Sequence, residues 1–133
     1  MYTISKTFAF CYGHRLCGDK GKCKNLHGHT AKTAIVLESE NLDDSGMVYH
    51  FDKLKETIGR WISENLDHTM ILSKDDPIAK LFDSLNERYL AIEGDPTAEN
   101  IAKLIYDTAK GLKLPVICVE MWESETSKAT YIP

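Results

Sequence analysis

The sequence predicts an α+β fold in which helices cover one face of a four-stranded antiparallel sheet. Two stretches rich in β-branched and aromatic residues, 2–12 and 30–39, come first and predict strands. Helical patterns follow in the middle of the chain, and two further strand-like stretches, 116–122 and 126–132, come last. This order of strands, helices and strands is typical of an α+β domain with two layers.

Three helical stretches are expected between the two pairs of strands. Apolar residues recur at helical spacing over 52–66, which predicts an amphipathic helix. A weaker helical pattern covers 77–90, and Thr97 is a good N-cap for a third helix that ends near Gly111. The apolar positions expected on the buried helix faces are Leu54, Ile58, Trp61, Ile62, Leu66, Ile101, Leu104, Ile105 and Leu112.

Length and composition limit the class of protein. With 133 residues, the chain fits one domain spanning 1–133. No apolar run approaches the ~18 residues of a membrane span. The N-terminus also lacks the charged, then apolar, then small residues that make up a secretory signal. A net charge of -4 argues against the basic surface that nucleic acids require. We therefore expect a cytoplasmic protein with neither a membrane nor a nucleic-acid partner.

A small basic island interrupts this acidic sequence, because Lys20, Lys22, Lys24 and nearby Arg15 surround Cys23. Such an island either attracts a small polyanion or is an ordinary solvated loop. A cationic environment also lowers the pKa of a thiol, so Cys23 would be able to abstract a proton. The alternative is an exposed thiol without a role. The four cysteines, without an export signal, are expected as free thiols or metal ligands rather than disulfides.

The strongest local signal is the His27-Gly28-His29 sequence, with His14 thirteen residues before it. Residues at i and i+2 of an extended segment point to the same side, so His27 and His29 can face one ion. His14, at the end of the first predicted strand, would supply a third imidazole. Three histidine ligands with an open fourth position are typical of catalytic zinc.

A closed structural zinc site is the alternative interpretation of the same segment. It would use Cys17 and Cys23 with His27 and His29, although five residues between the cysteines exceed the usual two to four. On that interpretation the chain is a non-catalytic, zinc-stabilised binding module.

Five short motifs follow one another along nearly the whole chain. They are Phe10-Cys11-Tyr12-Gly13-His14-Arg15-Leu16, Cys23-x-x-x-His27-Gly28-His29, Leu66-Asp67-His68, Pro96-Thr97-Ala98-Glu99-Asn100 and Trp122-Glu123. Each is weak alone, but the ordered series resembles the 6-pyruvoyl-tetrahydropterin synthase family. The resemblance implies the tunnelling fold and a homo-oligomer, in which trimers close their sheets into a barrel and two trimers stack into a hexamer.

The resemblance also implies a zinc-dependent enzyme acting on a reduced pterin, with a role for each site residue. The implied zinc ligands are His14, His27 and His29. The implied catalytic residues are Cys23, Asp67 and His68. The implied substrate-binding residues are Glu123 and Thr97. If active sites form between subunits, Glu123 and Thr97 would face zinc from a different protomer.

The spacing between Cys23 and His27 discriminates between branches of the family. Three residues separate them, as in bacterial 6-carboxytetrahydropterin synthases, whereas animal pyruvoyl synthases have five before the His-Gly-His sequence. The resemblance therefore implies conversion of 7,8-dihydroneopterin triphosphate to 6-carboxy-5,6,7,8-tetrahydropterin, a step towards the queuosine base. A pyruvoyl-type synthase, or a relative that cleaves dihydroneopterin, is the alternative.

Two departures from the family pattern stand out. His50 precedes Phe51 where family members usually have Asp, so we expect Asp52 to cap the following helix and His50 to be structural. The stretch 69–95 is also longer than in the compact bacterial enzymes.

Overall fold

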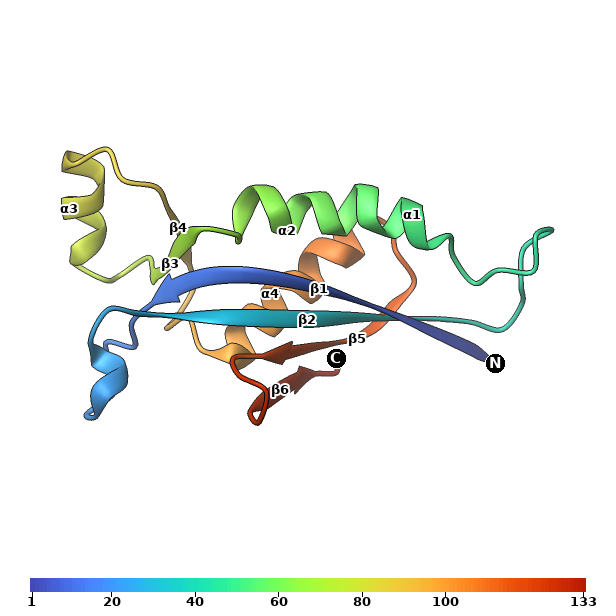
Figure 1. Cartoon of the computed structure of the whole chain (residues 1–133), viewed down its shortest axis with the longest axis horizontal. Coiled ribbons are helices and arrows are strands. Elements are labelled where there is room, and N and C mark those ends of the chain that lie inside the picture. Colours follow the sequence, from blue (N-terminus) through green and yellow to red (C-terminus); the bar gives the residue numbers. More distant parts are fainter.

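The chain folds around a six-stranded mixed sheet, and the computed structural model describes all residues from 1 to 133 (Figure 1). The sheet has the order β4-β3-β1-β2-β5-β6. Its strands are β1 (Tyr2–His14), β2 (His27–Ser39), β3 (Thr69–Ser73), β4 (Tyr89–Ile92), β5 (Val116–Trp122) and β6 (Lys128–Tyr131). The pairs β1–β2, β2–β5 and β5–β6 are antiparallel, as expected. However, β3 pairs with β1 and β4 with β3 in parallel, so the prediction of four antiparallel strands was wrong.

The two unpredicted strands lie in the long stretch 69–95. Buried parallel strands are continuous apolar runs without alternation, and short runs of this kind cannot be distinguished from helix by periodicity. The helix predicted over 77–90 is correspondingly shorter, since α3 covers only Ile78–Ser84 and residues 89–92 form β4. Figure 1 shows α3 at the same end of the sheet as the loop that joins β1 to β2.

One continuous helical rod follows β2 in sequence. It comprises α1 (Phe51–Leu54), the π-helical segment η2 (Lys55–Gly59) and α2 (Arg60–Asn65), and thus confirms the helix predicted over 52–66. His50 caps it through Nδ1, which accepts a hydrogen bond from the Asp52 backbone N–H at 3.1 Å. His50 is therefore structural, as expected, but the expectation that Asp52 is the cap was wrong.

The last helix, α4 (Ala98–Gly111), packs on β5 and β6 and confirms the third predicted helix. The Thr97 hydroxyl accepts a hydrogen bond from the Asn100 backbone N–H at 3.2 Å and caps the helix, as expected. Ile101 and Ile105 are fully buried. Leu112 is 43% exposed, contrary to the predicted buried face, because it follows the last helical residue.

The rod and α4 cover a single face of the sheet, as expected. On β1, Phe10, Tyr12 and His14 are buried beneath this layer, whereas the alternate residues Ala9 and Cys11 are exposed on the other face. The core therefore lies on one side of the sheet only. No helix of the chain combines the length and the apolar character needed to cross a membrane.

Candidate metal centre and substrate pocket

The candidate site begins where β1 and β2 pair at one end of the sheet. Their antiparallel register places His14 opposite His27 and Tyr12 opposite His29. Because side chains alternate along a strand, all three histidines lie on the helix-covered face. Gly28 fits between the two histidines of β2, since a Cβ there would approach the Tyr12 carbonyl oxygen to 3.1 Å. Both strands are longer than predicted and include all three histidines.

The three imidazoles converge on a single point. One nitrogen from each of His14, His27 and His29 lies within 4.8 Å of the other two, and the Nε2 atoms of His14 and His29 are 3.1 Å apart. Two nitrogens bound to one tetrahedral ion at ~2.0–2.1 Å stand about 3.3 Å apart, close to the observed separation. The predicted triad is therefore assembled and can hold a metal ion.

Backbone carbonyls orient two of these rings. The His14 Nδ1 atom lies 2.7 Å from the Pro96 carbonyl oxygen, and the His27 Nδ1 atom lies 2.7 Å from that of Asn25. A ring that donates Nδ1–H to a carbonyl keeps its Nε2 lone pair free for a metal ion. Burial lowers the pKa of His14, which favours the neutral form that metals require.

The cysteines lie outside this group. Cys23 is exposed in the short 3₁₀ segment η1 (Lys22–Lys24), and Cys17 is also an exposed free thiol. No group of three or more metal-binding side chains in the chain includes a cysteine. The closed site built from Cys17, Cys23, His27 and His29 is therefore not formed.

Glu123 connects the histidine group to an adjacent pocket. Its Oε1 atom lies 3.9 Å from the His14 Nε2 atom and accepts a hydrogen bond from the Tyr12 hydroxyl at 3.4 Å. Burial of the Tyr12 side chain is the main cause that raises its pKa, and the nearby Glu123 carboxylate raises it further. The hydroxyl therefore stays protonated and donates. Glu123 thus lies beside the histidines of its own chain.

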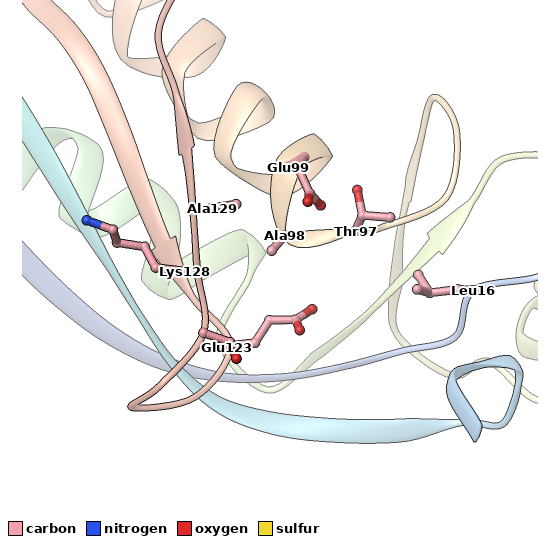
Figure 2. A pocket seen from close by; sticks show the side chains of 8 residues that line it. Leu16, Thr97, Ala98, Glu99, Glu123, Lys128 and Ala129 are labelled. Atoms are coloured by element: carbon pink, nitrogen blue, oxygen red, sulfur yellow. The ribbon is translucent and has the colours of Figure 1, made fainter. Parts of the chain in front are cut away.

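The pocket lies between the N-terminus of α4 and the β5–β6 hairpin. It is lined by Leu16, Thr97, Ala98, Glu99, Glu123, Ser127, Lys128 and Ala129. Figure 2 shows the carboxylates of Glu99 and Glu123 pointing into the same space, with Thr97 beside them. Thr97 and Glu123 therefore share a pocket, also within one chain. Glu99 was not predicted, although its place two residues after Thr97, in the first turn of α4, was an available signal.

Asp67 and His68 form a pair on the other side of β1. The His68 Nδ1 atom lies 2.9 Å from Asp67 Oδ2, and the His68 side chain is 80% exposed. Both residues are attached to Cys11, whose N–H donates to Asp67 Oδ1 and whose carbonyl accepts from the His68 N–H. The hydrogen bond from the Cys11 N–H is the main cause that lowers the pKa of Asp67, and the hydrogen bond and charge of His68 also lower it. Because Cys11 bonds them on its β3 side, neither residue contacts the histidine triad on the β2 side.

Arg15 does not belong to the free basic island. Its guanidinium donates to both carboxylate oxygens of Asp76, at 2.8 Å from Nε and 2.5 Å from Nη2. Asp76 is only 3% exposed and also accepts the Ile78 backbone N–H. This pair attaches the stretch 69–95 to the end of β1, one residue after His14.

Comparison with known proteins decides the family. Residues 3–133 match the family model described as 6-pyruvoyl tetrahydropterin synthase. The chain belongs to this family. The match covers the histidine triad, the Asp67–His68 pair and the pocket, so the resemblance inferred from five motifs is confirmed.

Curated relatives from the 6-pyruvoyl tetrahydropterin synthase family share about a third of the residues. The 6-carboxy-5,6,7,8-tetrahydropterin synthase of Haemophilus influenzae is 36% identical over 98% of this chain and 99% of its own length. The protein of the same name from Aquifex aeolicus is 33% identical over 98% of this chain and 97% of its own. These relatives match nearly from end to end.

Solved structures show the same fold. An uncharacterised protein from Wolinella succinogenes superposes with a TM-score of 0.82 at 29% identity, covering 98% of this chain and 97% of that one. The 6-pyruvoyl tetrahydropterin synthase of Caenorhabditis elegans has a TM-score of 0.75 at 24% identity, covering 99% and 95%. The mixed sheet with its helical layer is therefore the fold of this family.

Proposed function

We propose that this chain is a zinc-dependent 6-carboxytetrahydropterin synthase. It converts 7,8-dihydroneopterin triphosphate and water to 6-carboxy-5,6,7,8-tetrahydropterin, acetaldehyde and triphosphate, a step towards the queuosine base. One observation carries the proposal: the three-histidine group lies next to a pocket that contains two carboxylates. Glu123 belongs to this pocket, and its Oε1 atom lies 3.9 Å from the His14 Nε2 atom. The 36% identity to a curated 6-carboxytetrahydropterin synthase and the three residues between Cys23 and His27 support it.

The three histidines suit zinc better than a hard cation. Imidazole nitrogens are ligands that zinc prefers, whereas magnesium and calcium take oxygen ligands. His14, His27 and His29 would hold the ion with one coordination position left for substrate. Zinc would polarise the side-chain oxygens of the pterin and stabilise the negative charge that develops when a proton leaves carbon.

The pocket carboxylates would bind the pterin ring. The ring carries N–H groups along one edge, and a carboxylate can accept two hydrogen bonds from such an edge. Glu123 and Glu99 both point into the pocket, and the apolar side chains of Leu16 and Ala98 are placed to contact the flat ring. Thr97 completes the lining. The ring would then lie beside the metal centre, with its side chain reaching towards it.

Proton transfer is assigned to Cys23 and to the Asp67–His68 pair. Cys23 lies four residues before His27 in the exposed loop, where its thiolate would remove a proton from the substrate side chain. Histidine is the side chain that most readily exchanges protons near neutral pH, so His68 suits a proton shuttle. Asp67, 2.9 Å from its Nδ1 atom, would orient the ring and stabilise its protonated form.

The position of His68 supports an active site shared between subunits. Its side chain is 80% exposed at the β3 side of β1, whereas the triad lies on the β2 side of the same strand. We infer a homo-oligomer, a hexamer formed from two stacked trimers, in which His68 of one protomer serves the metal centre of its neighbour. Mixing inactive His27→Ala and His68→Ala proteins should then restore activity, since some sites receive both intact residues. No recovery from re-assembled mixed oligomers would contradict a shared site.

Direct assay tests the function. Zinc-loaded protein incubated with dihydroneopterin triphosphate should release acetaldehyde and 6-carboxytetrahydropterin in equal amounts. Cys23→Ala should keep its zinc and its fold but lose activity, whereas Cys118→Ala, which removes a thiol on β5, should remain active. Zinc loss and unfolding of Cys23→Ala would contradict the assignment of Cys23 as an unligated base.

A pyruvoyl-type activity is the alternative for the same site. It would yield 6-pyruvoyltetrahydropterin and triphosphate without acetaldehyde, and a dihydroneopterin-cleaving relative would accept the unphosphorylated compound. One assay with both substrates separates the three activities. The short spacing from Cys23 to His27 favours the carboxytetrahydropterin synthase.

A further inference from the structure

The loop between β1 and β2 carries three cations without partners. Lys20, Lys22 and Lys24 are exposed and lie on either side of Cys23. None of them takes part in any ion pair of the chain. Arg15, the fourth member of the basic island, is occupied by Asp76. We call Lys20, Lys22 and Lys24 the lysine cluster.

Hydrogen bonds hold this loop close to the metal centre. The Leu16 N–H donates to the Cys23 carbonyl at 2.8 Å, which closes the base of the loop. The Gly18 N–H donates to Asp95 Oδ2 at 3.1 Å, immediately before the Pro96 carbonyl that orients His14. The lysine cluster is therefore presented by a tethered loop rather than by a free chain segment.

The site has opposite charges at its two ends. At one end, Glu99 and Glu123 supply two carboxylates, and Glu123 lies 3.9 Å from the Nε2 atom of His14. At the other end, His27 is hydrogen-bonded to Asn25, the residue that follows Lys24 in the loop. The histidine triad is thus close to Glu123 through His14 and contacts the loop that carries the lysine cluster through His27.

This polarity orients a substrate that has an N–H-rich ring and an anionic tail. Glu99 and Glu123 would repel phosphates but accept hydrogen bonds from ring N–H groups. Lysine ammonium groups bind phosphate as point charges, and unpaired ones need not break an existing ion pair to do so. Lys128, although it lines the pocket, is paired with Glu120 at 2.7 Å and is not free in this way.

We propose that the lysine cluster binds the triphosphate of the substrate, with the pterin ring at Glu99 and Glu123 and the intervening side chain across the histidine triad. The proposal rests on the proposed function, because that function supplies the substrate. The same cluster would bind the triphosphate product, so inorganic tripolyphosphate is a probe that needs no turnover.

Two triple variants test the proposal in the zinc-loaded, full-length protein. One replaces Lys20, Lys22 and Lys24 by Gln. The matched control replaces Lys53, Lys80 and Lys110, which are also exposed and outside any ion pair of the chain, by Gln. Both lose three positive charges, so a general effect of net charge on anion binding cancels. The dissociation constant of tripolyphosphate is measured by calorimetry at low and at physiological salt.

We expect the lysine-cluster variant to bind tripolyphosphate at least about tenfold more weakly than wild type, since it loses several charge-assisted contacts. The control should change by less than about twofold, and wild-type binding should weaken as salt screens the charges. The ratio of kcat/KM for dihydroneopterin triphosphate to that for dihydroneopterin should fall by a similar factor in the lysine-cluster variant only.

Equal tripolyphosphate binding by the two triple variants, or none by wild type, would overturn the proposal. Zinc content and melting temperature are measured for each protein, and single Lys22→Gln and Lys24→Gln variants replace the triple one if it loses zinc. The two proposals can fail independently. If wild type binds tripolyphosphate through the lysine cluster but releases no acetaldehyde from dihydroneopterin triphosphate, the proposed function is wrong and the anion site stands.

Discussion

The Nδ1 atom of His14 lies 2.7 Å from the carbonyl oxygen of Pro96, although the two residues are 82 positions apart in the chain. Pro96 precedes Thr97, the N-cap of α4, so the cap of this helix and a ligand of the candidate metal centre are directly joined. Glu99, in the first turn of α4, faces the adjacent pocket. One short segment thus caps a helix, orients a candidate metal ligand and lines the adjacent pocket.

We predict that Thr97→Ala weakens both stability and metal binding. Loss of an N-cap hydroxyl costs about 1 kcal/mol of folding free energy. Loss of the cap should also shift the neighbouring Pro96 carbonyl, which orients His14. Metal affinity should then fall by up to about tenfold, because losing a group that orients a metal ligand weakens metal binding by about this factor. Thr108→Ala is the control, since its hydroxyl bonds the Leu104 carbonyl within α4. Thermal unfolding and chelator competition measure the two effects, and equal metal affinity in both variants would contradict the coupling.

Removing one histidine ligand should abolish tight metal binding. His27→Ala should lower metal affinity by at least about 100-fold, more than loss of an orienting group does. His50→Ala should retain the metal and lose only about 1 kcal/mol of stability, since His50 caps α1. Metal analysis after dialysis distinguishes the two. A chelator should lower the melting temperature of wild type and leave that of His27→Ala unchanged. Retention of a full equivalent of metal by His27→Ala would exclude the triad as the site.

Neutralising Glu123 should weaken substrate binding more than metal binding. Glu123→Gln keeps the size of the side chain but replaces the carboxylate by a neutral amide. The two charge-assisted hydrogen bonds expected from the ring N–H groups are then lost, so KM should rise by about tenfold or more. Glu125→Gln, on the exposed turn after β5, should behave as wild type. Steady-state kinetics with parallel zinc analysis tests this assignment. An unchanged KM in Glu123→Gln would place the ring elsewhere.

The Arg15–Asp76 pair should make stability depend on acid pH. The guanidinium holds the pKa of Asp76 at about 2, below its usual value of 3.8. A lowered pKa in the folded state adds stability above the unfolded value, which is lost as pH falls towards 2. Asp76→Asn should therefore cost about 2 kcal/mol at neutral pH, and the difference from wild type should shrink below pH ~3.8.

Denaturant unfolding at several pH values measures this dependence of stability on Asp76. Asp75→Asn is the matched control because Asp75 is exposed and has no ion-pair partner. If Asp76→Asn lost the same stability at pH 2 as at pH 7, the loss would not come from the ionised carboxylate.

Gly59 should tolerate no side chain, because a Cβ there would lie 2.6 Å from the Cε1 atom of Phe8. Gly59→Ala should therefore lower stability by about 1–3 kcal/mol through overpacking between the helical rod and β1. At Gly111 a Cβ would meet nothing within 4 Å. Gly111→Ala should be neutral or stabilising by up to about 1 kcal/mol. Melting temperatures compare the two, and equal effects would show that Phe8 moves aside.

Local patterns in the chain were sufficient to predict the histidine triad and the main helices. Strand alternation has a period of two, so His27 and His29 face the same side wherever the strand lies in the sheet. Helical periodicity likewise indicated which residues of 52–66 are buried, and Thr97 was recognisable as a cap from its own short motif. These features depend only on residues that are close in sequence.

Contacts between distant segments determined the rest. β3 is a strand because it pairs in parallel with β1, and β4 because it pairs in parallel with β3. A short apolar run does not indicate such pairing by itself. The Pro96 contact to His14, the place of Glu99 in the pocket and the separation of His68 from the triad likewise depend on how the sheet is assembled. Strand order and pairing arise from packing between segments far apart in the chain, whereas strand alternation and helix capping are set by neighbouring residues.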